Sequence, residues 1–150
     1  MTLAATELEA ERSDLIAMLD KNRYFLRHTT RDLTDEQARA RTTVSELTRS
    51  PRRTGKRTWP RWQEHFRLLD DETLAGALAE YDQAAAATDE FVAVLPDLNA
   101  AQPLPSAPWF PPGEHWSARR VLMHIIAKTA QHVGHADIIR ESIDGAKSMG

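Results

Sequence analysis

The sequence contains no cysteine and only 6 glycines among its 150 residues. Without cysteine, disulfide bonds, catalysis by a thiolate of the chain itself and zinc-finger sites are excluded. No run of about 20 apolar residues is present, and the N-terminal segment MTLAATELEAERSDL is too acidic and too broken for a signal peptide. We therefore expect a soluble, cytoplasmic protein with no membrane partner.

The balance of charge and the residue types set the class of protein. The chain has 19 basic and 22 acidic side chains and a net charge of −3, which argues against a protein built wholly for nucleic acid or for an anionic membrane. Few glycines, many alanines and a shortage of β-branched runs favour helices over strands. We expect a single all-α domain that spans residues 1–150.

Four segments carry apolar residues at helical spacing or a helix start signal. They are residues 6–30, 34–41, 71–95 and 118–143. Thr34 with Gln37 predicts a capping box, and Asp70 or Asp71 is expected to cap the third of these helices. Ser117 and Gly145 are the expected caps of the last helix. These four segments make up the expected bundle.

Residues 49–61 (RSPRRTGKRTWPR) interrupt the helical pattern. The segment holds six basic side chains, no acidic ones, two prolines and a glycine, so it is not a core helix. A solvated loop is the favoured interpretation. The alternative is contact with nucleic acid, in which Trp59 and Trp62 stack on bases, and the net charge of −3 argues against it for the chain as a whole.

A long loop between residues 95 and 117 contains six prolines. They are Pro96, Pro103, Pro105, Pro108, Pro111 and Pro112. Connections of this length in a small domain are typical of lids or of loops held by their own side chains. Trp109, Phe110 and Trp116 are expected to anchor the loop over one end of the bundle.

The last expected helix carries three histidines and a lysine in one sector. At about 100° per residue, and with His124 at zero, Lys128 falls near 40°, His132 near 80° and His135 near 20°. We call these four residues the histidine face. Apolar residues fall at similar angles, which predicts that His132 lies in the middle of the stripe that faces the core. They are Val121, Ile125, Ile139 and Ile143.

A buried imidazole needs a partner, such as a backbone carbonyl, a carboxylate or a metal ion. His132 and His135 are therefore either ligands of a metal or substrate, or histidines satisfied within the bundle. His124 is expected to be structural, His28 to stabilise the end of the first helix, and His65 to lie at the surface.

The run from Arg119 to Glu141 resembles the last helix of DinB-like four-helix bundles, in the branch that holds mini-circle-type proteins and the metal domain of mycothiol-dependent maleylpyruvate isomerase. Residues 15–39, residues 74–95, the proline-rich loop and Trp116 are similar to the same family, while residues 49–61 depart from it. The resemblance implies an up-down-down-up bundle that holds a divalent metal, zinc or nickel, through a histidine of the second long helix and a Glu-x-x-x-His pair of the last helix.

Two positions differ from the ligand pattern that the resemblance implies. His132 matches the family histidine, but Lys128 stands where the carboxylate is expected, and an ammonium group has no lone pair for a metal. No histidine lies between His28 and His65, where the second long helix is expected. We therefore expect a shortened or defective second helix and an incomplete metal site, with His132 and His135 as the remaining ligands and Asp137 as a substitute or outer partner.

Two functions fit these features. The first is a metal-dependent thiol S-transferase or isomerase that brings a low-molecular-weight thiol to a small electrophile. The second is a non-catalytic bundle that acts by self-association or partner binding. A missing helix would leave apolar surface uncovered, so a homodimer is expected in either case.

Overall fold

The computed structural model of the protein describes residues 3–42 and 68–148. Within these residues the chain forms four helices and one two-stranded sheet. They are α1 (Leu3–Thr30), α2 (Asp35–Arg39), α3 (Leu74–Val94), β1 (Ala101–Pro103), β2 (His115–Ser117) and α4 (Ala118–Asp144). The expected all-α class is confirmed. The small hairpin within the proline-rich loop was not predicted.

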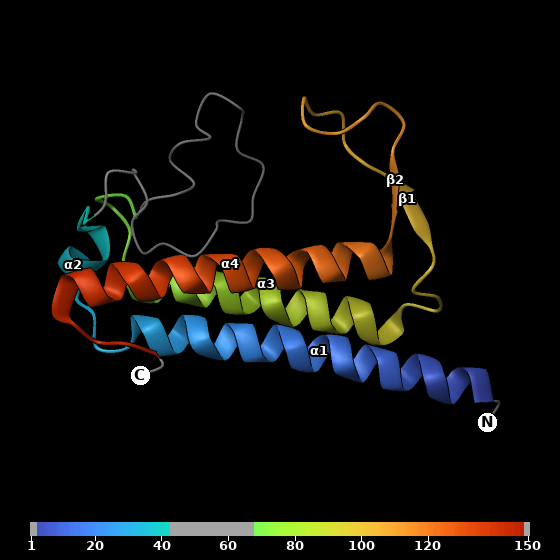
Figure 1. Ribbon diagram of the computed structural model, residues 1–150, viewed down its shortest axis with the longest axis horizontal. Helices are drawn as coiled ribbons and strands as arrows, with labels where there is room; N and C mark the ends of the chain where they lie inside the picture. The colour runs from blue at the N-terminus through green and yellow to red at the C-terminus, as the bar shows by residue number, and fades with distance from the viewer. Residues whose placement is uncertain (1–2, 43–67, 149–150) are drawn as a thin grey trace.

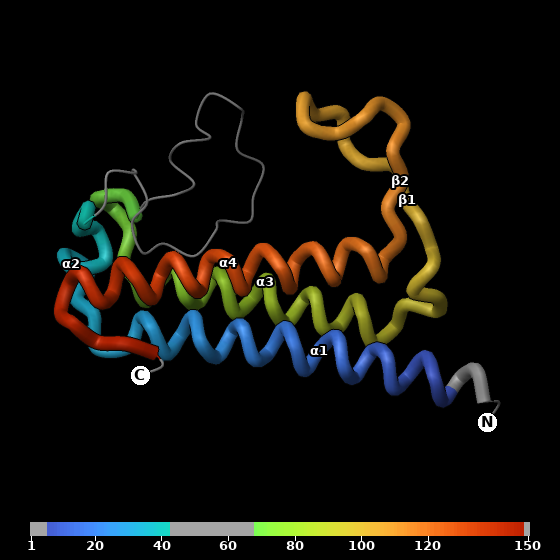
Figure 2. Tube along the Cα trace, viewed as in Figure 1, coloured from blue at the N-terminus to red at the C-terminus, as the bar shows by residue number. Residues whose placement is uncertain are grey.

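The three long helices lie side by side along the long axis of the molecule (Figure 1). Helix α3 runs antiparallel to α1, and α4 runs parallel to α1, as the traced path of the chain shows (Figure 2). These directions agree with the up-down-down-up order for the helices that are described. The expected second long helix, residues 49–61 and His65 lie outside the described residues.

Local sequence signals set three of the helix ends. Thr34 Oγ1 accepts from Gln37 N at 3.2 Å, and Gln37 Oε1 accepts from Thr34 N at 3.0 Å, which completes the expected capping box. Ser117 Oγ accepts from Arg120 N at 3.2 Å at the start of α4. Gly145 ends α4 in the left-handed region at φ 75°, a conformation that glycine adopts without a steric penalty.

The cap of α3 differs from the prediction. The helix is capped by Thr73, whose Oγ1 accepts from Gly76 N at 3.0 Å, and not by Asp70 or Asp71, so that prediction was wrong. Both aspartates lie in the preceding turn, which closes where Glu72 N donates to Leu69 O at 3.1 Å. Because of this turn, α3 begins at Leu74, three residues later than expected, and Thr73 stands at the N-cap position.

Two apolar clusters hold the helices together. In the larger one, Leu19 of α1, Val92 of α3 and Leu122 of α4 pack with Leu98, which follows α3 in the chain. The smaller one lies at the other end of α3, where its first residues pack against α2; its buried members are Ala38, Leu68 and Leu74. Burial of each leucine-sized side chain contributes about 1.5 to 3 kcal/mol to the stability of the fold. The two clusters therefore stabilise the contacts at the two ends of α3.

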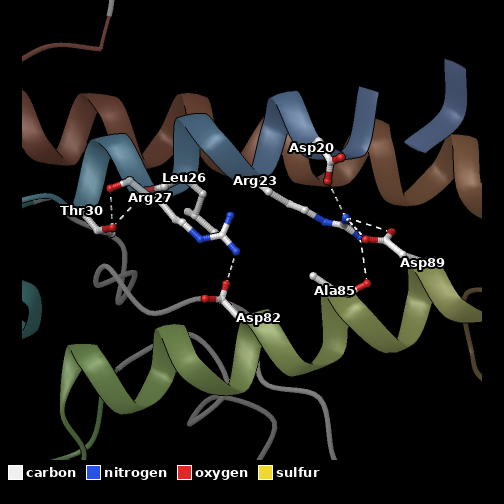
Figure 3. Close-up of polar contacts among 8 residues, drawn as sticks. All are labelled: Asp20, Arg23, Leu26, Arg27, Thr30, Asp82, Ala85 and Asp89. Atoms are coloured by element: carbon white, nitrogen blue, oxygen red, sulfur yellow. Dashed lines mark hydrogen bonds and ion pairs between the residues drawn. The ribbon is translucent and has the colours of Figure 1, made fainter. Parts of the chain in front are cut away.

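Between the two clusters, the contact of α1 with α3 is polar (Figure 3). The Arg23 side chain is 8% exposed, and its Nη1 lies 2.8 Å from Asp89 Oδ2 and 2.7 Å from Asp20 Oδ1. Its Nη2 donates to Ala85 O at 3.2 Å. Burial opposes the charge of Arg23, but the hydrogen bonds to Asp89 and Asp20 outweigh it and raise the pKa of the guanidinium. One turn on, Arg27 pairs with Asp82.

Helix α4 is fixed to α1 by apolar packing and by hydrogen bonds from Asn22 and Arg140. Asn22 Nδ2 donates to Ile126 O at 3.0 Å. Arg140 is buried, and its guanidinium donates to Thr29 O at 3.2 Å and also to Arg31 O. Thr29 lies in the last turn of α1 and Arg31 in the turn that follows it, where backbone carbonyls lack partners within the helix. Arg140 therefore caps a second helix from the side. In the described residues, no helix has the length and apolar character needed to cross a membrane.

Candidate functional site

The histidine face lies along the exposed side of α4. His124, Lys128 and His135 are exposed, and His132 is half-buried. The buried side chains of α4 overlap one edge of this sector, where Ile139 falls near 60°, and extend away from it to about 160° on the same wheel. They are Leu122, Ala136, Ile139 and Arg140.

The prediction that His132 lies in the middle of the buried stripe is therefore corrected: it lies at the edge. Val121, one of the residues used to define that stripe, is 38% exposed. The stripe extends further from the histidines because Leu122 and Ala136 contribute to it, and because the buried Arg140 cannot be recognised from an apolar pattern.

Each side chain of the histidine face has a defined neighbour. The rings of His132 and His135 are 6.3 Å apart between centroids, at an interplanar angle of 71°. Lys128 Nζ donates to Gln131 Oε1 at 3.2 Å. His124 packs edge to face against Trp116 at 5.1 Å. The face thus presents one ammonium group and three imidazoles.

The donors of this face do not fit a closed divalent-metal site. Two imidazoles from a single helix and a neighbouring ammonium leave the carboxylate and the ligand from a facing helix unsupplied. Within residues 3–42 and 68–148, no group of three histidine, aspartate or glutamate side chains is placed to share an ion. The expected metal-binding role of His132 and His135 therefore stays a prediction.

Asp137, the expected substitute ligand, is used elsewhere. Its Oδ1 accepts from Ser148 N at 2.8 Å and so holds the segment that follows α4. His28, at the end of α1, stacks on Tyr24 at 5.7 Å. Neither residue is brought to the histidine face. The described part of the site is therefore formed by α4 and by the residues of the hairpin loop that contact it.

One neighbour of the histidine face is a group of residues that we call the Trp116 cluster. Its members come from the hairpin loop and from the first two turns of α4, and they are Trp109, Phe110, Glu114, Trp116, Arg120 and His124. The hairpin that carries them pairs β1 and β2 in antiparallel register, with Gln102 opposite Trp116. Figure 1 shows the hairpin rising from the end of the bundle where α4 begins.

The Trp116 cluster is held by ring contacts and by charge. Trp109 meets Phe110 edge to face at 6.3 Å, and Phe110 meets Trp116 at 5.6 Å. Arg120 Cζ lies 4.4 Å from the centroid of the Trp116 ring, close enough for a cation–π interaction. The three aromatics expected to anchor the loop do contact one another, and Trp116 is the one whose ring contacts reach α4, at His124 and Arg120.

Glu114 and Arg120 were missed by the sequence analysis. Glu114 Oε1 accepts from Trp116 Nε1 at 3.0 Å and lies 3.1 Å from Arg120 Nη2. Arg120 is four residues after Trp116, but this spacing brings side chains together only within a helix, and Trp116 lies in β2. The position of Glu114 depends on the hairpin, so neither residue had a local sequence signal.

Comparison with known families gives one match. The profile described as MST: Mycothiol-S-transferase matches residues 44–145, which is more than half of the chain. The matched range includes residues 49–61, which had been expected to depart from the family, and it contains the Trp116 cluster and the whole histidine face. Searches of curated proteins and of solved structures gave no match. The chain therefore belongs to the Mycothiol-S-transferase family, a family of DinB-like bundles.

Proposed function

We propose that the protein transfers the thiol of mycothiol, or of a closely similar low-molecular-weight thiol, to a small electrophile. The observation that carries this proposal is the family match across residues 44–145, which includes all of α4 and its histidine face. In the reaction the thiol loses its proton, a sulfur–carbon bond forms, and the leaving group departs with the electron pair of its own bond.

The histidine face supplies what a thiol needs before it can react. The thiolate is the nucleophile, and nearby positive charge lowers the pKa of a thiol. Lys128 is exposed and one turn before His132, so its ammonium group can meet the sulfur of a bound ligand. Lys128 cannot act as the carboxylate ligand of a metal, but in this role its positive charge stabilises the thiolate.

A conjugation assay tests the proposal. Purified protein is incubated with mycothiol and chlorodinitrobenzene, and the thioether product is followed by its absorbance. We expect conjugation above the uncatalysed rate, a higher kcat/KM with mycothiol than with cysteine or glutathione, and a loss of about tenfold or more in Lys128→Met. Lys21→Met removes another exposed lysine, on α1, and is expected to leave the rate unchanged.

Two outcomes would contradict this function. One is a wild-type rate no greater than the uncatalysed rate with every thiol. The other is full activity in Lys128→Met, which would separate the reaction from the histidine face. Zinc added to both proteins shows in the same assay whether His132 and His135 support a metal-dependent rate.

A non-catalytic bundle is the second candidate, and exposed apolar side chains favour it. Large apolar residues are exposed on both α3 and α4; they are Phe91, Val94, Met123 and Ile138. Exposed apolar side chains can mark contact with another chain where they gather into one patch. Sedimentation of an inactive wild-type protein as a homodimer would support this candidate, and an inactive monomer would argue against it.

A further inference from the structure

The Trp116 cluster joins an exposed aromatic surface to the histidine face. Trp109 is 57% exposed at the outer end of the cluster. From Trp109 the rings follow one another through Phe110 and Trp116 to His124, with centroid separations of 6.3, 5.6 and 5.1 Å. His124 belongs both to this series and to the histidine face. The two groups therefore meet at His124, in the second turn of α4.

Fixed polar groups lie beside these rings. Glu114 and Arg120 form an ion pair at 3.1 Å, and each also contacts the indole of Trp116. A carboxylate has two acceptor oxygens and a guanidinium has five N–H donors, so both can bond a ligand while they keep these contacts. Because their charges cancel, the pair suits a neutral ligand with many hydroxyl groups better than it suits an anion.

These features together are suited to a sugar ring. The C–H face of a pyranose or cyclitol packs against an aromatic ring, and its hydroxyls bond to carboxylate and guanidinium groups at the rim. Mycothiol is such a ligand, because its cysteinyl thiol is carried on a glucosamine–inositol pseudodisaccharide.

The distance along α4 matches a ligand of this kind. Arg120 and Lys128 are eight residues apart, which is about 12 Å along a helix at 1.5 Å per residue. His124 lies between them, one turn from each. A molecule with sugar rings at one end and a thiol at the other can therefore contact the Trp116 cluster and Lys128 at the same time.

We propose that the Trp116 cluster binds the pseudodisaccharide of the thiol substrate, with Trp109 as the stacking surface and with Glu114 and Arg120 as partners of the hydroxyl groups. This assignment rests on the proposed thiol transfer, since it names the part of the substrate that is recognised away from the sulfur. It makes the cluster the determinant of which thiol is used.

Binding of the pseudodisaccharide alone, without its cysteine, tests this assignment independently of catalysis. Calorimetric titration of the wild type is expected to show saturable binding, and Trp109→Ala is expected to weaken it about tenfold, the size of one lost stacking contact. Tyr24→Ala is the matched control, because Tyr24 is 60% exposed on α1. Glu114→Gln, which keeps the size of the side chain, is expected to weaken binding as well.

Kinetics with a truncated thiol complete the test. The wild type is expected to use mycothiol with at least tenfold higher kcat/KM than N-acetylcysteine, and Trp109→Ala is expected to lower the value for mycothiol only. No binding of the pseudodisaccharide, or equal binding by the wild type and by both cluster variants, would overturn the assignment. Binding without transfer of any thiol would instead contradict the proposed function and leave the sugar site in place.

Discussion

The two faces of α4 differ in what they contain and in what they contact. The buried face carries Leu122, Ile139 and Arg140, and it packs on α1. The histidine face carries an ammonium group and imidazoles, and most of its residues are exposed. One helix thus separates the residues that stabilise the fold from those that are available to a ligand. Substitutions on the first face should change the free energy of unfolding, and those on the second face should change binding with little effect on folding.

The largest effect is expected at Leu122, in the cluster where α1, α3 and α4 meet. Leu122→Ala should lower the free energy of unfolding by about 3 kcal/mol, because it removes buried methyl groups and leaves a cavity. The neighbouring Met123 is 57% exposed, and Met123→Ala should change stability by less than about 0.5 kcal/mol. Urea denaturation of both variants measures the difference. Equal losses would show that the two faces of α4 are not distinct.

Arg140 tests whether a polar residue on the buried face matters as much as an apolar one. Arg140→Met should lower the free energy of unfolding by about 2 kcal/mol, because the carbonyls of Thr29 and Arg31 and the carboxylate of Asp144 each lose a hydrogen bond from the guanidinium. Lys147→Met is the control, since Lys147 and its partner Glu141 are both about half exposed and such pairs contribute about 0.5 kcal/mol or less. Similar stability of both variants in urea would contradict this prediction.

Lys128 tests the histidine face. Lys128→Glu restores a carboxylate four residues before His132 and should raise the affinity for zinc by up to about tenfold, because a ligand replaces a positive charge. The gain should be modest, since two ligands from one helix do not close a site. Calorimetric titration with zinc measures it, and Lys21→Glu controls for the change in net charge. Equal affinity in wild type and Lys128→Glu, or tight binding by the wild type, would show that the metal site is elsewhere or absent.

The smallest effect concerns the first turn of α4, where Arg119 binds Glu11 of α1. The hydrogen bond from Arg119 holds the pKa of Glu11 below its ordinary value of 4.5. A carboxylate with a lowered pKa stabilises the fold above its unfolded pKa, and this stabilisation is lost as the pH falls through its folded pKa. In Glu11→Gln the free energy of unfolding should therefore fall less steeply as the pH drops below about 4.5. Its dependence on pH near pH 7 should be unchanged. Thermal unfolding across this range measures it; an unchanged acid limb would count against the pair.

Sequence reasoning succeeded where structure follows from local signals. The capping box at Thr34, the cap at Ser117 and the left-handed Gly145 depend on residues only a few positions apart, and all three are confirmed. The start of α3 was placed too early because the turn at residues 70–72 competes with the helix for the same residues.

Features that depend on distant residues were not predicted. The burial of Arg23 and Arg140 results from carboxylates and carbonyls supplied by other helices. The ion pair of Glu114 with Arg120 results from the hairpin, which residues 101–103 and 115–117 form across the proline-rich loop. For the site, the sequence placed the four side chains of the histidine face in one sector, but it did not find the polar members of the Trp116 cluster beside them.

The polar contact between α1 and α3 has a consequence for the alignment of the helices. Arg23 with Asp89 and Arg27 with Asp82 form two rungs between antiparallel helices, and Arg23 is almost wholly buried. A slide of α3 by one turn, about 5.4 Å, would still allow leucines and alanines to pack, but it would separate the buried Arg23 from Asp89 and leave Asp20, on its own helix, as its carboxylate partner. Loss of such a charge-assisted hydrogen bond costs about 1.5 to 3 kcal/mol. Apolar surfaces can pack in more than one alignment, whereas the ion pairs of Arg23 and Arg27 raise the free energy of a shifted one. The same two residues therefore select one alignment of α3 on α1 among several whose free energies would be nearly equal if only apolar contacts were present.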